Sequence, residues 1–156
     1  MIKTNAMRLL TQAGIDYELL EYEVDENHLA GIHVAEQTGL AAEQVFKTLV
    51  AHGDKRGYLV FCIPVTEELD LKKAAQVVGD KKIEMVHVKD LLSLTGYIRG
   101  GCSPVGMKKK FPTYFDETAE IFERIAVSAG VRGGQLFLDR EKLVAYLKAE
   151  YAQLTA

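Results

Sequence analysis

The sequence is poor in cysteine and in long apolar runs. Its two cysteines, Cys62 and Cys102, form neither a CxxC pair nor a cysteine and histidine cluster with the spacing of a zinc site. We therefore expect no structural disulfide and no metal site. No apolar run approaches the ~18 residues of a membrane span, and residues 1–5 do not begin a secretory signal. These absences predict a cytoplasmic protein with no membrane partner.

An excess of positive charge is also missing, because the formal net charge is −3. Nucleic-acid affinity normally comes from Lys and Arg side chains that neutralise phosphates, so any RNA contact here must be local or assisted by a partner. The densest basic run is 108–110, with shorter pairs at 72–73 and 81–82. A solvated surface is the simpler interpretation of each run, because lysine is mostly exposed in any protein.

Signatures of nucleotide and nucleophile chemistry are absent as well. The segment 100–104 is neither GxGxxG nor GxxxxGKS/T, so it predicts no dinucleotide or Walker-type site. The four histidines show no HExxH pattern, and none is placed to identify a base for Cys102 or Ser103. We expect no cofactor, and covalent catalysis is the weaker interpretation of these two side chains.

What the sequence does contain is the mixture of helix and strand patterns of an α+β protein. Its 156 residues, 48% of them hydrophobic, suit one domain over residues 1–156. Periodicity and capping residues predict helices at 4–13, 34–38, 70–78, 89–94 and 139–151, strands at 17–24, 45–51, 58–64, 82–86, 113–116, 125–128 and 136–138, and a polar loop at 25–28. The elements do not alternate regularly, which favours a mixed, mostly antiparallel sheet centred on 45–51 and 58–64.

Lys47 interrupts an otherwise apolar strand. Burying an ammonium costs several kcal/mol unless a carboxylate, phosphate or set of carbonyls receives it, so a ligand is a natural partner for this side chain. The alternative is that the stem covers apolar surface while the charged end reaches water. Thr48 offers a hydroxyl beside it.

A second candidate is the segment Gly100-Gly101-Cys102-Ser103-Pro104. Two permissive glycines could present backbone N–H groups to a carbonyl oxygen that becomes an oxyanion, as ester hydrolysis requires. An ordinary surface turn explains the same residues. Ser103 is a candidate for orienting a substrate.

Several short motifs follow one another along nearly the whole chain. They are Tyr22, the strand Phe46-Lys47-Thr48-Leu49, the helix start Asp70-Leu71-Lys72-Lys73-Ala74-Ala75, Thr95-Gly96-Tyr97, Gly100-Gly101-Cys102-Ser103-Pro104-Val105-Gly106 and Ser128-Ala129-Gly130. Each motif is weak alone, but together they are specific, and in this order they resemble the YbaK/EbsC family.

The resemblance implies a barrel-like sheet surrounded by helices, like the editing domain of bacterial prolyl-tRNA synthetases, and a trans-editing deacylase that clears cysteine from tRNA(Pro). It implies that Lys47 holds the terminal adenosine or its phosphate, with Thr48 beside it and Tyr22 on the pocket wall. Gly100, Gly101 and Ser103 would line the aminoacyl ester, and the substrate's own thiol would assist its cleavage. Further substrate contacts are expected from Cys102, Pro104 and Asp139.

Other interpretations stay open at this point. Leu29-Ala30-Gly31 stands where some members of the family have an aromatic residue, and the residue after the two glycines varies, so alanine on tRNA(Pro) is the second substrate. A non-catalytic module that binds tRNA ends or prolyl-tRNA synthetase is the alternative from another class. The oligomeric state does not follow from the sequence.

Overall fold

The computed structural model describes residues 2–24 and 31–156. The predicted polar loop at 25–28, and Leu29 and Ala30, lie outside these residues. The described elements, in chain order, are α1 (Asn5–Gln12), β1 (Tyr17–Glu21), α2 (Gly31–Thr38), η1 (Ala42–Gln44), β2 (Phe46–Gly53), β3 (Gly57–Pro64), α3 (Leu71–Val78), β4 (Ile83–Met85), α4 (Val88–Thr95), β5 (Thr113–Asp116), η2 (Glu117–Ile121), β6 (Arg124–Ser128), β7 (Gly134–Asp139), α5 (Arg140–Leu147) and β8 (Glu150–Ala152).

The strands form two sheets that meet at one point. The larger, five-stranded sheet has the order β4-β2-β3-β5-β8, with β2 antiparallel to both β3 and β4, and with β3, β5 and β8 parallel. The smaller sheet is antiparallel and has the order β1-β7-β6. A parallel bridge between Val45 and Ala126 joins the two. The predicted α+β class and mixed sheet are confirmed, and β2 and β3 lie inside the larger sheet as expected.

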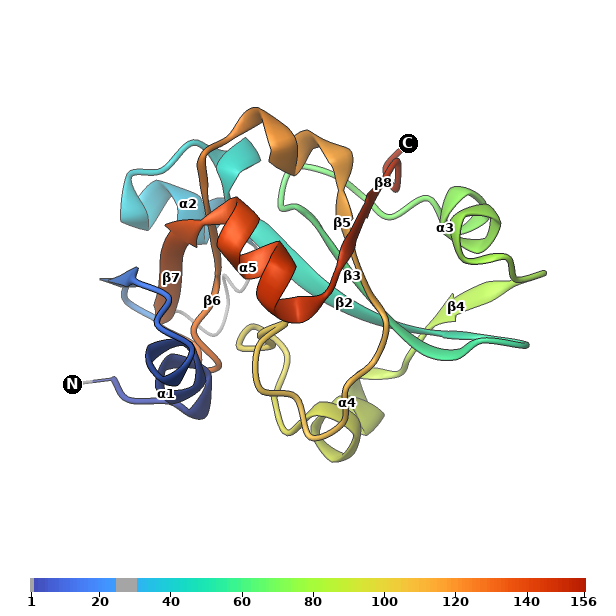
Figure 1. Ribbon diagram of the computed structural model, residues 1–156, viewed down its shortest axis with the longest axis horizontal. Helices are drawn as coiled ribbons and strands as arrows, with labels where there is room; N and C mark the ends of the chain where they lie inside the picture. The colour runs from blue at the N-terminus through green and yellow to red at the C-terminus, as the bar shows by residue number, and fades with distance from the viewer. Residues whose placement is uncertain (1, 25–30) are drawn as a thin grey trace.

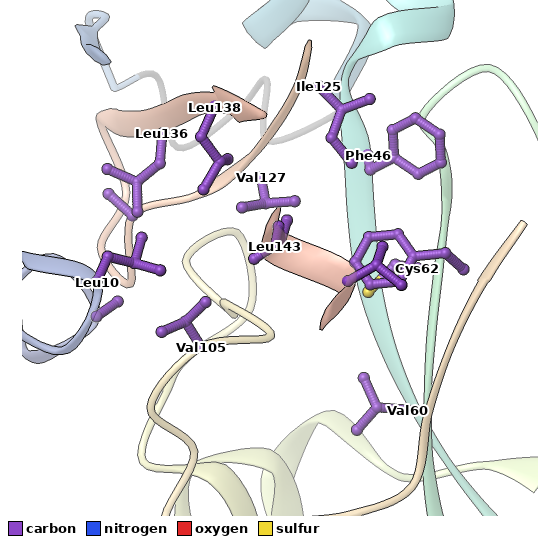
Figure 2. Close-up of a cluster of buried hydrophobic side chains, with 14 of the residues drawn as sticks. Leu10, Phe46, Val60, Cys62, Val105, Ile125, Val127, Leu136, Leu138 and Leu143 are labelled. Atoms are coloured by element: carbon purple, nitrogen blue, oxygen red, sulfur yellow. The ribbon is translucent and has the colours of Figure 1, made fainter. Parts of the chain in front are cut away.

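The main core fills the space between the sheets, with α1 and α5 beside it (Figure 2). Figure 2 shows side chains from both sheets pointing into one cluster, among them Phe46, Cys62 and Val127, together with Leu143 of α5; all four are almost fully buried. A second cluster under α3 covers the other face of the larger sheet, and a third lies between α2 and the smaller sheet. In Figure 1, α1 and the smaller sheet lie at one end of the molecule and α3 and β4 at the other.

The predicted caps position the helices. Thr4 Oγ1 accepts a hydrogen bond from Met7 N at 3.2 Å, and Asp70 Oδ1 accepts from Lys72 N and Lys73 N at 3.1 Å. Gly79 and Gly96 end α3 and α4 in the left-handed conformation that glycine adopts at little cost. Each described α-helix has eight residues, and none is long and apolar enough to cross a membrane.

Two predicted boundaries are wrong. The strand expected at 17–24 ends at Glu21, although Tyr22 N still donates to Gly133 O at 3.0 Å. The helix expected at 139–151 ends at Leu147, because Lys148 takes a left-handed φ of 53°. The residues after it form β8, which pairs with β5 in parallel. The expected helix covered residues 150 and 151, so this strand was not predicted.

Asp116, at the end of β5, binds the C-terminal segment 150–156 to the larger sheet. Its side chain is 1% exposed; Oδ1 accepts from Leu154 N at 3.0 Å and Oδ2 accepts from Thr118 Oγ1 at 2.6 Å. We expect Asp116→Ala to lower the free energy of unfolding by about 3 kcal/mol, because buried donors lose their acceptor. Urea denaturation measures the change, with the exposed Asp54→Ala as control. Equal unfolding midpoints for the two variants would contradict the role given to Asp116.

Candidate functional site

A pocket of about 610 Å³ opens along one edge of β2. The strand pairs with β4 only at Ala51–Gly53, and Val86 N donates to Val50 O at 3.1 Å. Between this point and the bridge at Val45, that edge of β2 has no strand partner among the described residues. The pocket therefore lies where the smaller sheet leaves β2 and before β4 joins it, so main-chain groups of residues 46–49 border the cavity.

Four structural units close the pocket around this edge. They are α2, the end of β3 with the segment before α3, β4 with α4, and a wall made of the glycine segment and the ends of β6 and β7. From this last wall the lining residues are Arg99, Gly100, Cys102, Ser128 and Gln135.

Lys47 lies at the rim of the pocket. Its side chain is 29% exposed, which confirms the predicted partly buried position. The nearest carboxylate oxygen, Glu68 Oε1, is 4.0 Å from Nζ and belongs to a side chain that is 93% exposed. An exposed pair at this distance contributes little. The ammonium is therefore left available for an anion or a carbonyl group in the pocket.

Thr48 points away from Lys47, because successive side chains of a strand face opposite sides of the sheet. Its Oγ1 lies 3.8 Å from Cys62 Sγ, on the side of the main core. Both residues border the pocket, since it runs along the strand edge between the two faces.

Cys102 lines the pocket but is not a nucleophile at neutral pH. Its residue is 8% exposed, and burial raises the pKa of its thiol to about 12, although a hydrogen bond with Thr95 acts in the opposite direction. The thiolate, which is the reactive form, is therefore absent near pH 7. No described histidine lines the pocket. This geometry agrees with the expectation that neither Cys102 nor Ser103 acts as an activated nucleophile.

The glycine segment forms a wall against the turn between β6 and β7. Gly100 has a φ of +85°, and Arg132 Nε donates to Arg99 O at 2.9 Å across this contact. Gly101 N donates to Ile98 O at 3.0 Å, so this N–H is already occupied by the turn. An oxyanion donor from this segment would have to be another backbone N–H.

Gly101 is needed for a steric reason. A Cβ atom there would lie 2.9 Å from Val131 C and 3.0 Å from Arg132 N, and both are backbone atoms. We expect Gly101→Ala to displace the wall, lowering turnover about tenfold and stability by about 1–3 kcal/mol. Gly14→Ala is the control, because it places alanine at a φ of +73° with open space around it. Gly14→Ala should lose stability and keep its activity. Equal losses of turnover in Gly14→Ala and Gly101→Ala would contradict the steric role of Gly101.

The structure places the other predicted residues outside the lining of the pocket. Ser103 is fully buried, and its Oγ accepts from Val105 N at 3.2 Å. Pro104 is buried beside it, and Tyr22 is half-buried just after β1. Asp139 caps α5, where its Oδ1 accepts from Lys142 N at 2.9 Å. Of the nine predicted site residues, the pocket thus brings together Lys47, Thr48, Gly100 and Cys102.

Four polar lining residues, Glu68 at the rim and three on the inner wall, had no predicted role. Arg99 follows a glycine-ended helix, and Ser128 belongs to a motif that carried the family resemblance. Gln135 is a polar residue of β7, next to the apolar residues 136–138. A polar side chain within an otherwise apolar strand was the available signal. Among the described residues, no three His, Cys, Asp or Glu side chains gather into a metal site.

Comparison with known proteins defines the class. Residues 30–146 match the family model described as the aminoacyl-tRNA editing domain. EbsC of Enterococcus faecalis, named as a proposed Cys-tRNA(Pro)/Cys-tRNA(Cys) deacylase, is 49% identical over 98% of this chain and 93% of that protein. The chain belongs to the aminoacyl-tRNA editing domain family, and the resemblance to YbaK/EbsC proteins is confirmed.

Solved structures have the same fold. A crystal structure described as a proposed trans-editing enzyme for prolyl-tRNA synthetase superposes with a TM-score of 0.87 at 25% identity, covering 100% of this chain and 99% of that one. The protein APE2540, described as hypothetical, superposes with a TM-score of 0.89 at 18% identity over 98% of this chain and 100% of the other. The fold is therefore retained at low sequence identity.

Proposed function

We propose that this protein is a trans-editing deacylase that cleaves the aminoacyl ester of mischarged tRNA, with cysteinyl-tRNA(Pro) as its first substrate. The observation that carries the proposal is the available ammonium of Lys47 at the rim of a pocket whose inner wall holds Gly100. The relative from Enterococcus faecalis, named for deacylation of Cys-tRNA(Pro) and Cys-tRNA(Cys), supports the choice of cysteine.

The division of labour follows from the position of each group. Lys47, at the rim, binds the terminal adenosine or its phosphate, with Arg99 as a second cation of the lining. Gly100 and Cys102, on the opposite wall, border the aminoacyl group. The enzyme then contributes mainly orientation, which can supply much of the rate enhancement when the reacting atoms are held together.

The attacking group comes from outside the protein in this scheme. The described lining provides neither a histidine base nor an ionised thiol. Either the thiol of the bound cysteine or a water molecule attacks the ester carbonyl, and the 3′-terminal ribose of the tRNA leaves with a proton. A need for editing is physically clear, because a pocket that admits proline cannot strongly exclude a residue of similar or smaller size.

The partners of this reaction are part of the same proposal. The tRNA would be tRNA(Pro), delivered in the cytoplasm, and the single domain over residues 1–156 would act with prolyl-tRNA synthetase. The net charge of −3 supports a partner, because the protein carries too little positive charge for strong RNA binding by itself.

Alanine on tRNA(Pro) is the second substrate, and a non-catalytic module that binds tRNA ends is the competing function. The absence of a histidine base from the described lining favours the module. Deacylation of labelled Cys-tRNA(Pro), Ala-tRNA(Pro) and Pro-tRNA(Pro) by purified protein separates the three. Selective loss of the cysteinyl ester is the expected result. If all three esters decay at the uncatalysed rate while the protein still binds tRNA, the protein is a non-catalytic binding module and not a deacylase.

A further inference from the structure

Gln135 is a buried polar side chain on the wall of the pocket. It lies in the middle strand of the smaller sheet, opposite Ser128 on β6 and Leu20 on β1, and is 6% exposed. Leu136 and Leu138 of the same strand point into the main core. Because side chains alternate along a strand, Gln135 faces the other side, toward α2 and β2, where the pocket lies.

The carboxamide oxygen of Gln135 has no hydrogen-bond partner. Among the described residues it is the one buried side-chain nitrogen or oxygen atom in this state. Buried polar atoms are nearly always satisfied in folded proteins, so an exception on a pocket wall points to a ligand group that completes it. The oxygen of a carboxamide only accepts hydrogen bonds, and the missing group must therefore be a donor.

The neighbouring groups do not supply this donor. The hydroxyl of Ser128 accepts from Gly130 N at 3.1 Å and makes no hydrogen bond with Gln135 Oε1, and the thiol of Cys102 is a weak donor. The charged residues that line the cavity are Lys47, Arg99 and Glu68, and the two cations suit the anionic end of a substrate. Gln135 shares its wall with Arg99, Gly100 and Cys102, where the proposed function places the aminoacyl group.

We infer that Gln135 Oε1 accepts a hydrogen bond from the α-ammonium group of the aminoacyl ester. The inference rests on the proposed function, since it assigns a group of that substrate. A neutral acceptor suits the position, because a carboxylate would be a buried, unpaired charge whenever the pocket is empty. It follows that the substrate class is an ester with a free α-amino group, and that Gln135 is a specificity residue within the pocket.

The test uses two esters of the same tRNA that both retain the thiol. One is cysteinyl-tRNA(Pro), and the other is its 3-mercaptopropionyl analogue, which lacks only the amino group. We expect the wild-type protein to favour the cysteinyl ester in kcat/KM by about 10- to 100-fold, the range of a hydrogen bond to a charged group. Gln135→Met should lose this preference by slowing the cysteinyl ester alone.

Gln135→Met also has a stability readout. It fills a similar volume without a polar atom, so its melting temperature should be unchanged or higher. Gln44 provides the matched control, because its Nε2 donates to Arg124 O at 2.9 Å outside the pocket. Gln44→Met should lower the melting temperature and leave the preference intact. Gln135→Glu is a second variant of the same shape, and it should keep or increase the preference.

Two results would overturn the inference while leaving the proposed function in place. One is a wild-type protein that cleaves both esters equally well, and the other is an equal loss on both esters in Gln135→Met. If the wild-type protein cleaves neither ester, the result would instead contradict the proposed function, and the inference about Gln135 would fail with it.

Discussion

Replacing Lys47 with alanine is expected to lower kcat/KM for cysteinyl-tRNA(Pro) about 100- to 1000-fold, the range seen when one preorganised electrostatic contact to a substrate is removed. The reason is the position of its ammonium, 29% exposed at the rim, where only the distant and exposed Glu68 approaches it among the described residues. A substrate phosphate or carbonyl group in the pocket is the better partner. Single-turnover deacylation with labelled substrate measures the loss.

Two control variants make this result specific. Lys47→Met keeps the length of the side chain and the packing of β2, so it should lose as much activity as Lys47→Ala while unfolding at the wild-type denaturant concentration. Lys142 is exposed on α5, outside the pocket lining, and Lys142→Ala should retain full turnover. Wild-type turnover by Lys47→Met would show that the charge plays no part in the reaction.

Raising the pH from 8 to 11 is expected to lower the free energy of unfolding by about 5 kcal/mol. Burial raises the pKa values of Cys62 and Cys102 from 9.0 to about 12, so both thiols stay protonated in the folded protein at pH 11. The unfolded chain loses these protons above pH 9. A folded pKa above the unfolded one means that the stabilisation is complete below pH 9 and is lost as the pH rises toward 12.

Urea denaturation at intervals of pH measures this loss, and a variant with both Cys62→Ala and Cys102→Ala is the control. Removing the thiols should flatten most of the pH dependence, although Tyr97, whose pKa burial also raises to about 12, leaves a smaller slope above pH 10. Cys62→Ala alone should leave deacylation near neutral pH largely intact, because Cys62 lies outside the pocket lining. An equally steep loss of stability in the variant would exclude the thiols as its cause.

The sequence predicted the fold best where local pattern and tertiary packing agree. The apolar run of β3 belongs to a strand with both faces buried, and residues 59–64 are indeed buried. The helices with side-chain caps at Thr4 and Asp70 begin where predicted. β8 was not predicted, because the helix expected at 139–151 covered most of it and the strand depends on its pairing with β5. The division of the strands into two sheets is also a property of long-range pairing.

The candidate site was predicted in part for the same reason. A lysine within an apolar strand is visible in the sequence, and Lys47 does border the pocket. The open edge of β2 is invisible there, because it depends on where β4 and β6 stop pairing. The unpartnered oxygen of Gln135 is likewise a tertiary property. Ser103 and Asp139 have the right chemistry, but their side chains accept local backbone hydrogen bonds, which the sequence alone did not reveal.

The bridge between Val45 and Ala126 has a consequence for synthesis on the ribosome. The hairpin of β2 and β3 involves neighbouring segments and closes early, whereas the bridge joins residues far apart in the sequence. Contacts of long sequence separation form late, since loop-closure entropy must be overcome first. Ser128 and Gln135 leave the ribosome after the other residues that line the pocket. A chain made only as far as Cys102 therefore lacks this part of the wall, and the pocket is complete only after Gln135 has been added.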